Sequence, residues 1–372
     1  MPSDRDAPIL RVHGGPVLDE LRALGIDAAD LLDFSVNLNP YGPAPAMIEA
    51  ILSAAIDVYP DPTAAKARAA LARSCAVSPD QIVLGNGGAE LLWTLARVLA
   101  RPGQTVLMVE PTFSEFRAAA KVAGATIVEW RAAPDTGFAF DAGAVVKSVR
   151  ACAARALYLC SPNNPTGSIV RASEVSALAS ALPEVQVILD QAFLSLSEHH
   201  SDGAVALPAN VIRVRSLTKE HTIPGVRVGY LLATPALAAA IEAARPAWTT
   251  SAAAEAAALA SVNLTSFVDE SRRRLLSDRQ ELVAGLRAID LSPVPTRTTF
   301  CVVPVPNGAR LRESLLVRHR LLVRDCASFR LPGYIRLAAR PQADRARLLA
   351  ALKEELAAVR VAAPTKRATR SG

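Results

Sequence analysis

The feature that most constrains the fold is an alternation of short apolar runs with helix-favouring stretches between residues 81 and 232. The runs have the length of buried strands, and three of the stretches between them contain no glycine or proline. Strands that alternate with helices form a mostly parallel sheet covered by helices on both faces, so we predict an α/β fold around a seven-stranded sheet. The predicted strands are Gln81–Leu84, Thr105–Val109, Ala125–Val128, Ala156–Cys160, Val185–Leu189, Val211–Val214 and Val228–Leu232. The predicted helices between them include Ala89–Ala100, Ser114–Ala123 and Ala172–Ala181.

The pattern changes at about residue 250. A long stretch rich in alanine, arginine and glutamate predicts a helix over Ala252–Ala288, and short strand-like pieces and a last helix follow it. Those later pieces are Thr299–Val303, Leu321–Val323, Tyr334–Leu337 and the helix Ala343–Val359. We predict a large domain and a smaller α+β domain, the latter assembled from both ends of the chain. The predicted segments are 1–45 in the small domain, 46–245 as the large domain, 246–362 in the small domain, and a disordered tail at 363–372.

Composition excludes several classes of protein. Hydrophobic residues make up 51% of the 372 residues, which is enough to fill a core and excludes disorder as the main state. The most apolar stretches, such as Leu231–Ile241, are shorter than the roughly 20 residues of a membrane-spanning helix, and no secretory signal is visible. Five cysteines without metal-like spacing predict a reduced, cytoplasmic protein with no metal site. The net charge of +6 indicates an anionic partner.

The most informative segment is Val214–Ala233, with the sequence VRSLTKEHTIPGVRVGYLLA. Its lysine, Lys219, stands in a short polar turn between apolar strands, where partial desolvation can remove the proton. A neutral lysine amine can form a Schiff base with an aldehyde. Ser216 and Arg227 are suited to bind a phosphate, one through its hydroxyl and the other through a bidentate guanidinium. Taken alone, the segment can equally be a strand–turn–strand with a solvated lysine.

Three further segments place polar groups at strand ends. Asp190 ends a predicted strand, where a carboxylate points into the ligand crevice of a parallel sheet and needs a cationic partner such as a protonated pyridine nitrogen. The turn SPNNPTG follows another strand and can aim the amide of Asn164 at a ring substituent. The glycines of NGGAELL, at Asn86–Leu92, let backbone amides approach an anion at a helix N-terminus. Each of these segments is common when taken alone.

Their order and spacing resemble the aspartate aminotransferase superfamily, fold type I of the pyridoxal-phosphate enzymes. The resemblance covers nearly the whole chain, from GGAE and PTF through NNPTG and D-x-A-F to S-x-T-K with an arginine eight residues later. It implies bound pyridoxal 5'-phosphate, held by Lys219 in an internal aldimine and by Asp190 at the pyridine nitrogen. It further implies Asn164 at the ring oxygen, Phe113 on the ring face, and Gly88, Ala89, Ser216 and Arg227 at the phosphate. Tyr59, in VYPDP, matches a tyrosine that such enzymes lend to the partner's cofactor in a homodimer.

The N-terminal segment narrows the resemblance to one branch of that superfamily. HGG at His13–Gly15, LLDFSVNLNPYGP at Leu31–Pro43 and YPDP look like the branch that holds histidinol-phosphate aminotransferase and L-threonine-O-3-phosphate decarboxylase. HGG, S-L-T-K, L-V-R-D-C and Phe193 in place of tyrosine lean toward the decarboxylase. Phenylalanine cannot give the ring oxygen the hydrogen bond that tyrosine gives. Glu220 and His221 replace the aromatic or small residues that the branch leads us to expect, so the substrate can differ from that of both relatives.

The resemblance also implies four substrate-binding residues. Arg336, in YIRLAAR, matches the arginine that grips the substrate α-carboxylate, and the alternative is an arginine on a surface strand. Arg324, Asn37 and His13 are candidates for the distal group of the substrate, which in both relatives is a phosphate. For His13 and Asn37 the alternative is simple packing of the N-terminal segment and a turn.

The sequence therefore predicts a pyridoxal-phosphate-dependent enzyme that acts at Cα of a small anionic α-amino acid or amine, phosphorylated substrates included, through an external aldimine and a quinonoid. Transamination and decarboxylation are equally favoured. An alternative is elimination or carbon–carbon bond formation from the same quinonoid. An alternative of another class is a non-catalytic regulatory or binding protein with an aminotransferase-like fold. His13 lies too near the start for a helix-turn-helix domain to precede it, and the basic tail is too short for sequence-specific recognition, so we expect no nucleic-acid partner and no membrane partner.

Overall fold

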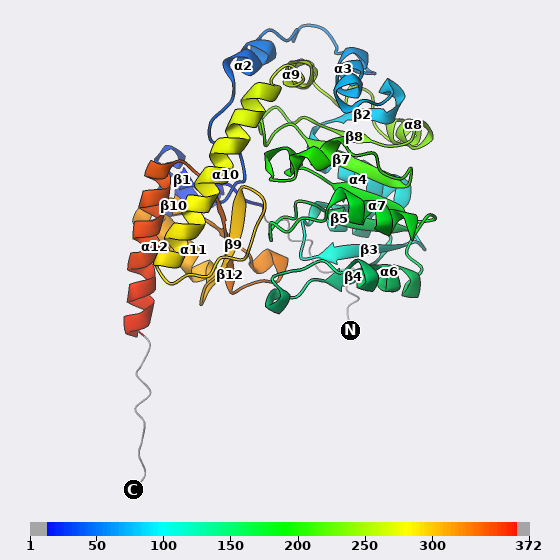
Figure 1. Ribbon diagram of the computed structural model, residues 1–372. Helices are drawn as coiled ribbons and strands as arrows, with labels where there is room; N and C mark the ends of the chain where they lie inside the picture. Colours follow the sequence, from blue (N-terminus) through cyan, green and yellow to red (C-terminus); the bar gives the residue numbers. More distant parts are fainter. Residues whose placement is uncertain (1–12, 363–372) are drawn as a thin grey trace.

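The computed structural model describes residues 13–362 (Figure 1). The predicted disordered tail, 363–372, and residues 1–12 of the predicted N-terminal segment lie outside the described residues. The described chain forms two groups of sheets, with a large sheet on one side and two small sheets on the other.

The large sheet has seven mostly parallel strands, as predicted. Its strand order is β2-β8-β7-β6-β5-β3-β4, in which β8 is antiparallel to both of its neighbours and the other pairs are parallel. The strands are β2 (Ile82–Gly85), β3 (Thr105–Glu110), β4 (Thr126–Arg131), β5 (Ala156–Cys160), β6 (Gln186–Asp190), β7 (Val211–Ser216) and β8 (Gly229–Leu232). Because parallel strands all run the same way, the carboxyl ends of β5, β6 and β7 meet at one edge of this sheet.

Helices cover both faces of the large sheet, because successive strand residues point to opposite faces. On β5, Tyr158 packs with α4 (Gly87–Leu99), α5 (Glu115–Val122) and α8 (Pro235–Ala243). Its neighbour Leu157 packs on the other face with α6 (Ala142–Ala151) and α7 (Ala172–Ser180). A third core joins β2 and β8 to α2 (Pro45–Leu52), α3 (Ala65–Cys75) and α9 (Ala252–Ser261).

The single helix predicted over Ala252–Ala288 is wrong, because the structure divides it into α9 and α10 (Thr265–Ala288). The break falls in the sequence Ser261–Thr265, SVNLT, where serine, asparagine and β-branched residues favour helix weakly. α9 packs against α2 and α3, whereas α10 extends to the small sheets (Figure 1). α9 and α10 therefore pack in different parts of the molecule.

The smaller part contains a three-stranded antiparallel sheet, β11-β12-β9, and a parallel pair, β1-β10. Phe34 of the N-terminal segment shares a core with Leu282, Leu315 and Leu352 from the C-terminal third. The elements are α1 (Leu18–Leu24), β1 (Leu32–Asp33), β9 (Phe300–Pro304), α11 (Gly308–His319), β10 (Leu321–Leu322), β11 (Arg324–Asp325), β12 (Tyr334–Ala338) and α12 (Gln342–Ala362). The domain limits drawn from the sequence remain a proposal.

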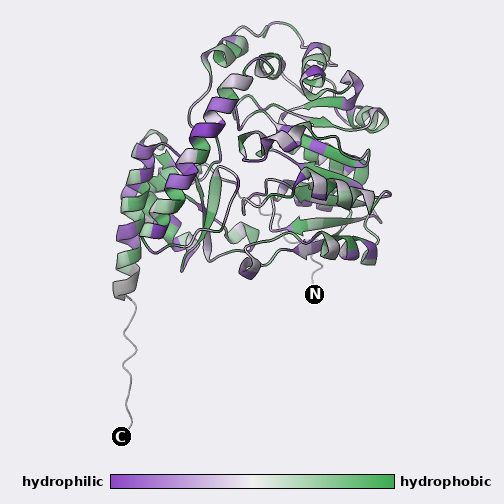
Figure 2. Cartoon of the chain, in the orientation of Figure 1, coloured by the Kyte–Doolittle hydropathy of each residue, from purple (hydrophilic) through white to green (hydrophobic). Residues whose placement is uncertain are grey.

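Hydrophobic residues fill the strands of the large sheet, whereas hydrophilic residues lie along α10 (Figure 2). Within residues 13–362, no helix combines the length and the apolar character that crossing a membrane would require. Short 3-10 helices connect the larger elements. They are η1 (Ala28–Asp30), η2 (Pro79–Gln81), η3 (Pro134–Thr136), η4 (Leu194–Leu196), η5 (His200–Ala204) and η6 (Ala327–Phe329).

Candidate active site

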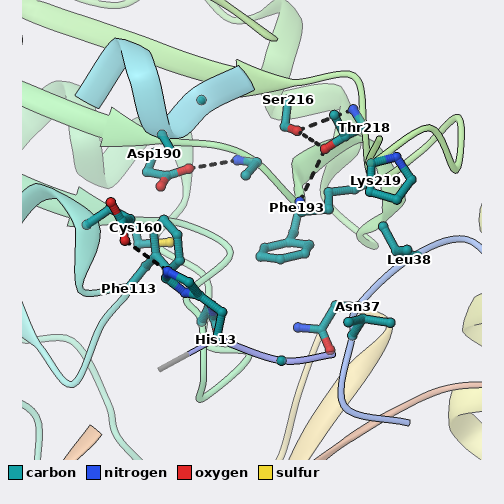
Figure 3. Close-up of a pocket in the computed structure, with 18 of the residues that line it drawn as sticks. His13, Asn37, Leu38, Phe113, Cys160, Asp190, Phe193, Ser216, Thr218 and Lys219 are labelled. Atoms are coloured by element: carbon teal, nitrogen blue, oxygen red, sulfur yellow. Dashed lines mark hydrogen bonds and ion pairs between the residues drawn. The ribbon is translucent and has the colours of Figure 1, made fainter. Parts of the chain in front are cut away.

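A cavity of about 490 Å³ lies where the carboxyl ends of β5, β6 and β7 meet the N-terminal segment and strands β11 and β12. Side chains from the N-terminal segment and from the ends of β6 and β7, among them Asn37, Asp190 and Lys219, lie around one common space (Figure 3). All but one of the residues predicted for the site line this cavity. They are His13, Asn37, Gly88, Ala89, Phe113, Asn164, Asp190, Ser216, Lys219, Arg227, Arg324 and Arg336.

Lys219 follows β7 in a short polar loop, and its amine faces the cavity (Figure 3). Lys219 Nζ donates a hydrogen bond to Thr218 Oγ1 at 3.2 Å, and the hydroxyls of Thr218 and Ser216 are 2.7 Å apart. Burial, together with the positive charges of Arg227 and Arg336, lowers the pKa of Lys219 to about 8, and the negative charge of Asp190 opposes these effects. An appreciable fraction of the amine is therefore neutral, and nucleophilic, near neutral pH.

Asp190 ends β6 and is buried at the floor of the cavity. One carboxylate oxygen accepts a hydrogen bond from the Ala192 amide at 3.0 Å, and the other accepts one from the Tyr158 hydroxyl at 2.8 Å. Burial raises the pKa of Asp190, whereas these two bonds and the charge of Lys219 lower it. The site thus supplies a buried carboxylate that, among residues 13–362, forms no direct ion pair with a cationic side chain. The sequence analysis did not identify Tyr158 as a partner of Asp190, because its position in the sequence indicates only a buried strand residue.

The N-terminus of α4 forms a close-fitting anion cradle. A Cβ atom on Gly87, whose φ is +79°, would lie 2.5 Å from Arg227 Nη2. A Cβ on Gly229 would lie 2.9 Å from the backbone nitrogen of Gly88. The positive φ of Gly87 and the backbone collision at Gly229 therefore both favour glycine here. The helix N-terminus, Ser216 and Arg227 together offer donors suited to a phosphate.

Aromatic rings and one amide border the middle of the cavity. The Phe113 ring lies 5.6 Å from the His13 ring, tilted by 43°. Phe193, the residue in place of tyrosine, packs edge-on against Phe300 at 5.1 Å. The hydroxyl that phenylalanine lacks is thus replaced by an apolar contact. Asn164, from the loop after β5, is buried in the same wall.

Two arginines lie opposite each other on antiparallel strands. Arg324 of β11 is the register partner of Arg336 of β12, and both side chains are buried. Burial lowers the pKa of Arg336 to about 10 and also lowers that of Arg324. Arg324 donates to the Ser328 hydroxyl at 2.6 Å. Like charges directly opposite each other are destabilising. Asp325 Oδ2, 3.6 Å from Arg324 Nη1, offsets part of this repulsion, and a bound anion would offset more of it.

Asn37 is buried, yet within residues 13–362 neither atom of its side-chain amide has a hydrogen-bond partner. Leaving a buried amide unpaired costs free energy, which indicates a ligand position. His13 Nε2 lies 2.9 Å from Glu115 Oε1, and Glu115 also accepts a hydrogen bond from Trp93 Nε1 at 2.7 Å. Sequence reasoning missed Glu115, which has no signal beyond its place two residues after PTF.

Comparison with known proteins places the chain in a family. Residues 29–353 match the family model described as aminotransferase class I and II. The chain belongs to the class I and II aminotransferase family. It is 32% identical over 350 residues to a histidinol-phosphate aminotransferase from Symbiobacterium thermophilum, a match that covers 93% of this chain and 95% of the relative.

Solved structures agree with this family assignment. The histidinol-phosphate aminotransferase from Sinorhizobium meliloti, solved in complex with pyridoxal-5'-phosphate, has a TM-score of 0.82 and 28% identity, covering 96% of this chain and 98% of that one. The L-threonine-O-3-phosphate decarboxylase from Porphyromonas gingivalis has a TM-score of 0.77 and 22% identity, covering 88% and 100%. The predicted aspartate aminotransferase-like fold, the predicted branch and the prediction of a pyridoxal-phosphate-dependent enzyme are thereby confirmed.

Tyr59 is the one predicted site residue of this aminotransferase-family chain that does not line the cavity. Tyr59 is 80% exposed as a residue, and its ring centroid lies 4.8 Å from that of Trp248. Exposed apolar residues surround it in sequence, among them Leu52, Ile56 and Val58. Tyr59 therefore does not contribute to the cavity of its own chain.

A second cavity, of about 230 Å³, borders the same lysine loop. Lys219 lines the first cavity, whereas the next two residues, Glu220 and His221, line the second. Burial raises the pKa of Glu220 to about 7 and lowers that of His221 to about 4. The two residues that depart from the expected pattern are thus turned away from the predicted cofactor site.

Proposed function

We propose that the larger cavity binds pyridoxal 5'-phosphate, with Lys219 as the residue that attacks its aldehyde. Three features support this. The Lys219 amine has a pKa of about 8, Asp190 offers a buried carboxylate, and a Cβ at Gly229 would collide with the backbone of the cradle. These features fit the aldehyde, the pyridine nitrogen and the phosphate of the cofactor.

The bound cofactor supplies an electron-withdrawing ring that weakens the bonds to the substrate Cα. Asp190 would hold the pyridine nitrogen in its protonated form, and the Gly88 and Ala89 amides with Ser216 and Arg227 would hold the phosphate. Asn164 would bind the ring oxygen and Phe113 would contact the ring face. The Lys219 amine, whose pKa lies near neutrality, is suited to accept the Cα proton and to return it.

The substrate class rests on the buried pair Arg324 and Arg336. Two buried arginines on paired strands offer guanidinium groups for two anions, and a bidentate grip suits a carboxylate or a phosphate. We assign Arg336 to the α-carboxylate, and Arg324 with Asn37 and His13 to a distal anion. The substrate would then be a small amino compound that carries one or two anionic groups, with a phosphorylated amino acid matching the full set.

The proposed reaction is transamination of such a substrate, which the histidinol-phosphate aminotransferases among the relatives support. Decarboxylation is the second candidate. The Arg324–Arg336 pair favours it, because a phosphorylated α-amino acid presents a carboxylate and a phosphate to the two arginines at once. Histidinol phosphate has no carboxylate and would leave one guanidinium without its anion.

One experiment separates these reactions. Protein reconstituted with pyridoxal phosphate is mixed with phosphorylated and unphosphorylated amino acids and amines, while the absorbance spectrum and CO2 release are followed. Transamination predicts that the yellow colour fades with the amino substrate and returns with a 2-oxo acid. Decarboxylation predicts CO2 release with no oxo acid present. A colourless protein that ignores added pyridoxal phosphate would overturn the proposal.

We further propose a homodimer in which Tyr59 reaches the cofactor phosphate of the partner. The exposure of Tyr59 and of its apolar neighbours Ile56 and Val58 supports this, because a second copy would cover them. We place the enzyme in the cytoplasm, and the five free cysteines support a reducing compartment.

A further inference from the structure

Tyr158 is fully buried in β5, and it is not among the residues that line the cavity. In the sheet, Cys160 of β5 is the register partner of Asp190 of β6, whereas Tyr158 is opposite Ile188. The long tyrosine side chain therefore reaches diagonally along the strands, and its hydroxyl donates a hydrogen bond to Asp190 Oδ2 at 2.8 Å.

The core fixes the position of this hydroxyl. The Tyr158 ring stacks on the Phe116 ring of α5, with centroids 5.1 Å apart and planes 12° apart. Both side chains are fully buried in the core between the large sheet and α4, α5 and α8. A close-packed core leaves the ring little freedom, so the hydroxyl is a rigidly placed donor.

The carboxylate of Asp190 is held from both sides. Its Oδ1 accepts from the Ala192 amide and its Oδ2 from Tyr158. Hydrogen bonds to a carboxylate favour its charged form, whereas burial favours the neutral form. A neutral Asp190 cannot pair with a protonated pyridine nitrogen.

We propose that Tyr158 is a positioning residue that orients the Asp190 carboxylate and keeps it ionised, so that Asp190 can hold the pyridine nitrogen of pyridoxal phosphate. The role rests on the proposed contact between Asp190 and the cofactor. Tyr158 itself touches neither the cofactor nor the substrate.

The test uses Tyr158→Phe, which keeps the ring and its stacking and removes only the hydroxyl. The affinity of the cofactor-free full-length protein for pyridoxal phosphate is measured as a function of pH. Removing the donor raises the pKa of Asp190, so the loss of affinity on the acid side begins at a higher pH. We expect its midpoint to rise by about one to two pH units, from the strength of a hydrogen bond to a charged group. An unchanged midpoint would overturn the role of Tyr158.

Tyr230→Phe is the matched control, because it removes another buried hydroxyl from the same sheet. The Tyr230 hydroxyl lies 3.6 Å from Cys75 Sγ and is outside the larger cavity. Its removal should leave the midpoint where it is in the unmodified protein. If Tyr158→Phe does not fold, Phe116→Leu retains the hydroxyl and loosens its support. A smaller rise is expected there, and no rise counts against the proposal.

A double variant shows whether the hydroxyl acts through Asp190. In an Asp190→Asn background, Tyr158→Phe should cause no further loss of affinity, because the group that it acts on no longer titrates. An equal loss in both backgrounds means that Tyr158 acts elsewhere. If the unmodified protein does not bind pyridoxal phosphate, the proposed function itself fails. If it binds and only the shift is missing, the role of Tyr158 alone fails.

Discussion

The side-chain oxygen of Asn164 accepts a hydrogen bond from the Arg336 guanidinium. Asn164 belongs to the loop after β5 of the large sheet, and Arg336 belongs to β12 of the small sheet. The residue predicted for the cofactor ring and the residue predicted for the substrate carboxylate are thus in direct contact. Arg336 also donates to the Ser35 carbonyl of the N-terminal segment, and within the described residues its Nε has no hydrogen-bond partner.

Replacing Arg336 tests the carboxylate grip. Arg336→Lys keeps a positive charge and loses the planar fork, so kcat/KM for carboxylate substrates should fall about 100-fold, as expected when one partner of a buried charge pair is changed. Amine substrates without a carboxylate should lose much less. Arg297→Lys, at an exposed arginine paired with Glu198, is the control and should leave kcat/KM unchanged. Equal losses for both substrate classes would show that Arg336 serves only the structure.

Replacing Asn37 tests the distal anion site. Asn37→Ala removes an amide with no hydrogen bond to lose within the described residues, so the free energy of unfolding should change by less than about 0.5 kcal/mol. The KM for a phosphorylated substrate should rise about tenfold. Asn210→Ala should do the opposite, because the Asn210 amide donates to three backbone carbonyls. It should cost about 1–3 kcal/mol of stability and leave KM unchanged. A large stability loss from Asn37→Ala would contradict the assignment.

The reactivity of Lys219 should depend on pH with a midpoint near its pKa of about 8, far below the 10.5 of an ordinary lysine. Below that pH the amine is protonated and cannot attack an aldehyde, so Schiff-base formation should become faster as the pH rises through 8. Reductive trapping of a small aldehyde, quantified by mass spectrometry, measures this rate. Arg227→Met should raise the midpoint, because the charge of Arg227 lowers the pKa. Lys219→Ala supplies the blank, and a midpoint near 10 would refute the prediction.

The stability of the fold should respond to pH through Glu220. Burial raises its pKa from 4.5 to about 7, so the folded state binds this proton more tightly than the unfolded chain does. The stability that it contributes is complete below pH 4.5 and is lost as the pH rises through 7. Glutamine has no such proton to lose. As the pH rises from 4.5 to above 7, the unfolding free energy of Glu220→Gln should therefore increase by about 1–3 kcal/mol relative to that of the unmodified protein. Urea unfolding at several pH values measures the difference, and parallel curves would disprove it.

Subunit exchange tests the dimer. Lys219→Ala and Tyr59→Ala proteins should each be impaired, because each lacks part of every site. A mixed dimer of the two should regain one complete site, formed by Lys219 of one subunit and Tyr59 of the other. Activity that reappears on mixing, with a dimer mass by sedimentation, supports the proposal. Mixing that restores nothing, with exchange verified, would count against a shared site.

The sequence by itself determined the helices and strands and the side chains that carry the chemistry, because both depend on residues that are close together in the chain. β5 begins and ends at the predicted residues, and Asp190 stands at the predicted strand end. Polar side chains after buried strands fall at one edge of a parallel sheet whatever the remaining packing, so Lys219, Asp190 and Asn164 could be brought together from the sequence.

The tertiary structure alone decided how those groups are supported. Arg324 is the register partner of Arg336 because β11 pairs with β12. β11 has only two residues, which is too short to give a recognisable pattern in the sequence. Tyr158 and Glu115 join the site only because neighbouring strands and α5 lie in one particular register against each other. Such contacts join residues far apart in the chain. Local periodicity says which face of an element is buried, and only the packed structure says which side chains meet there.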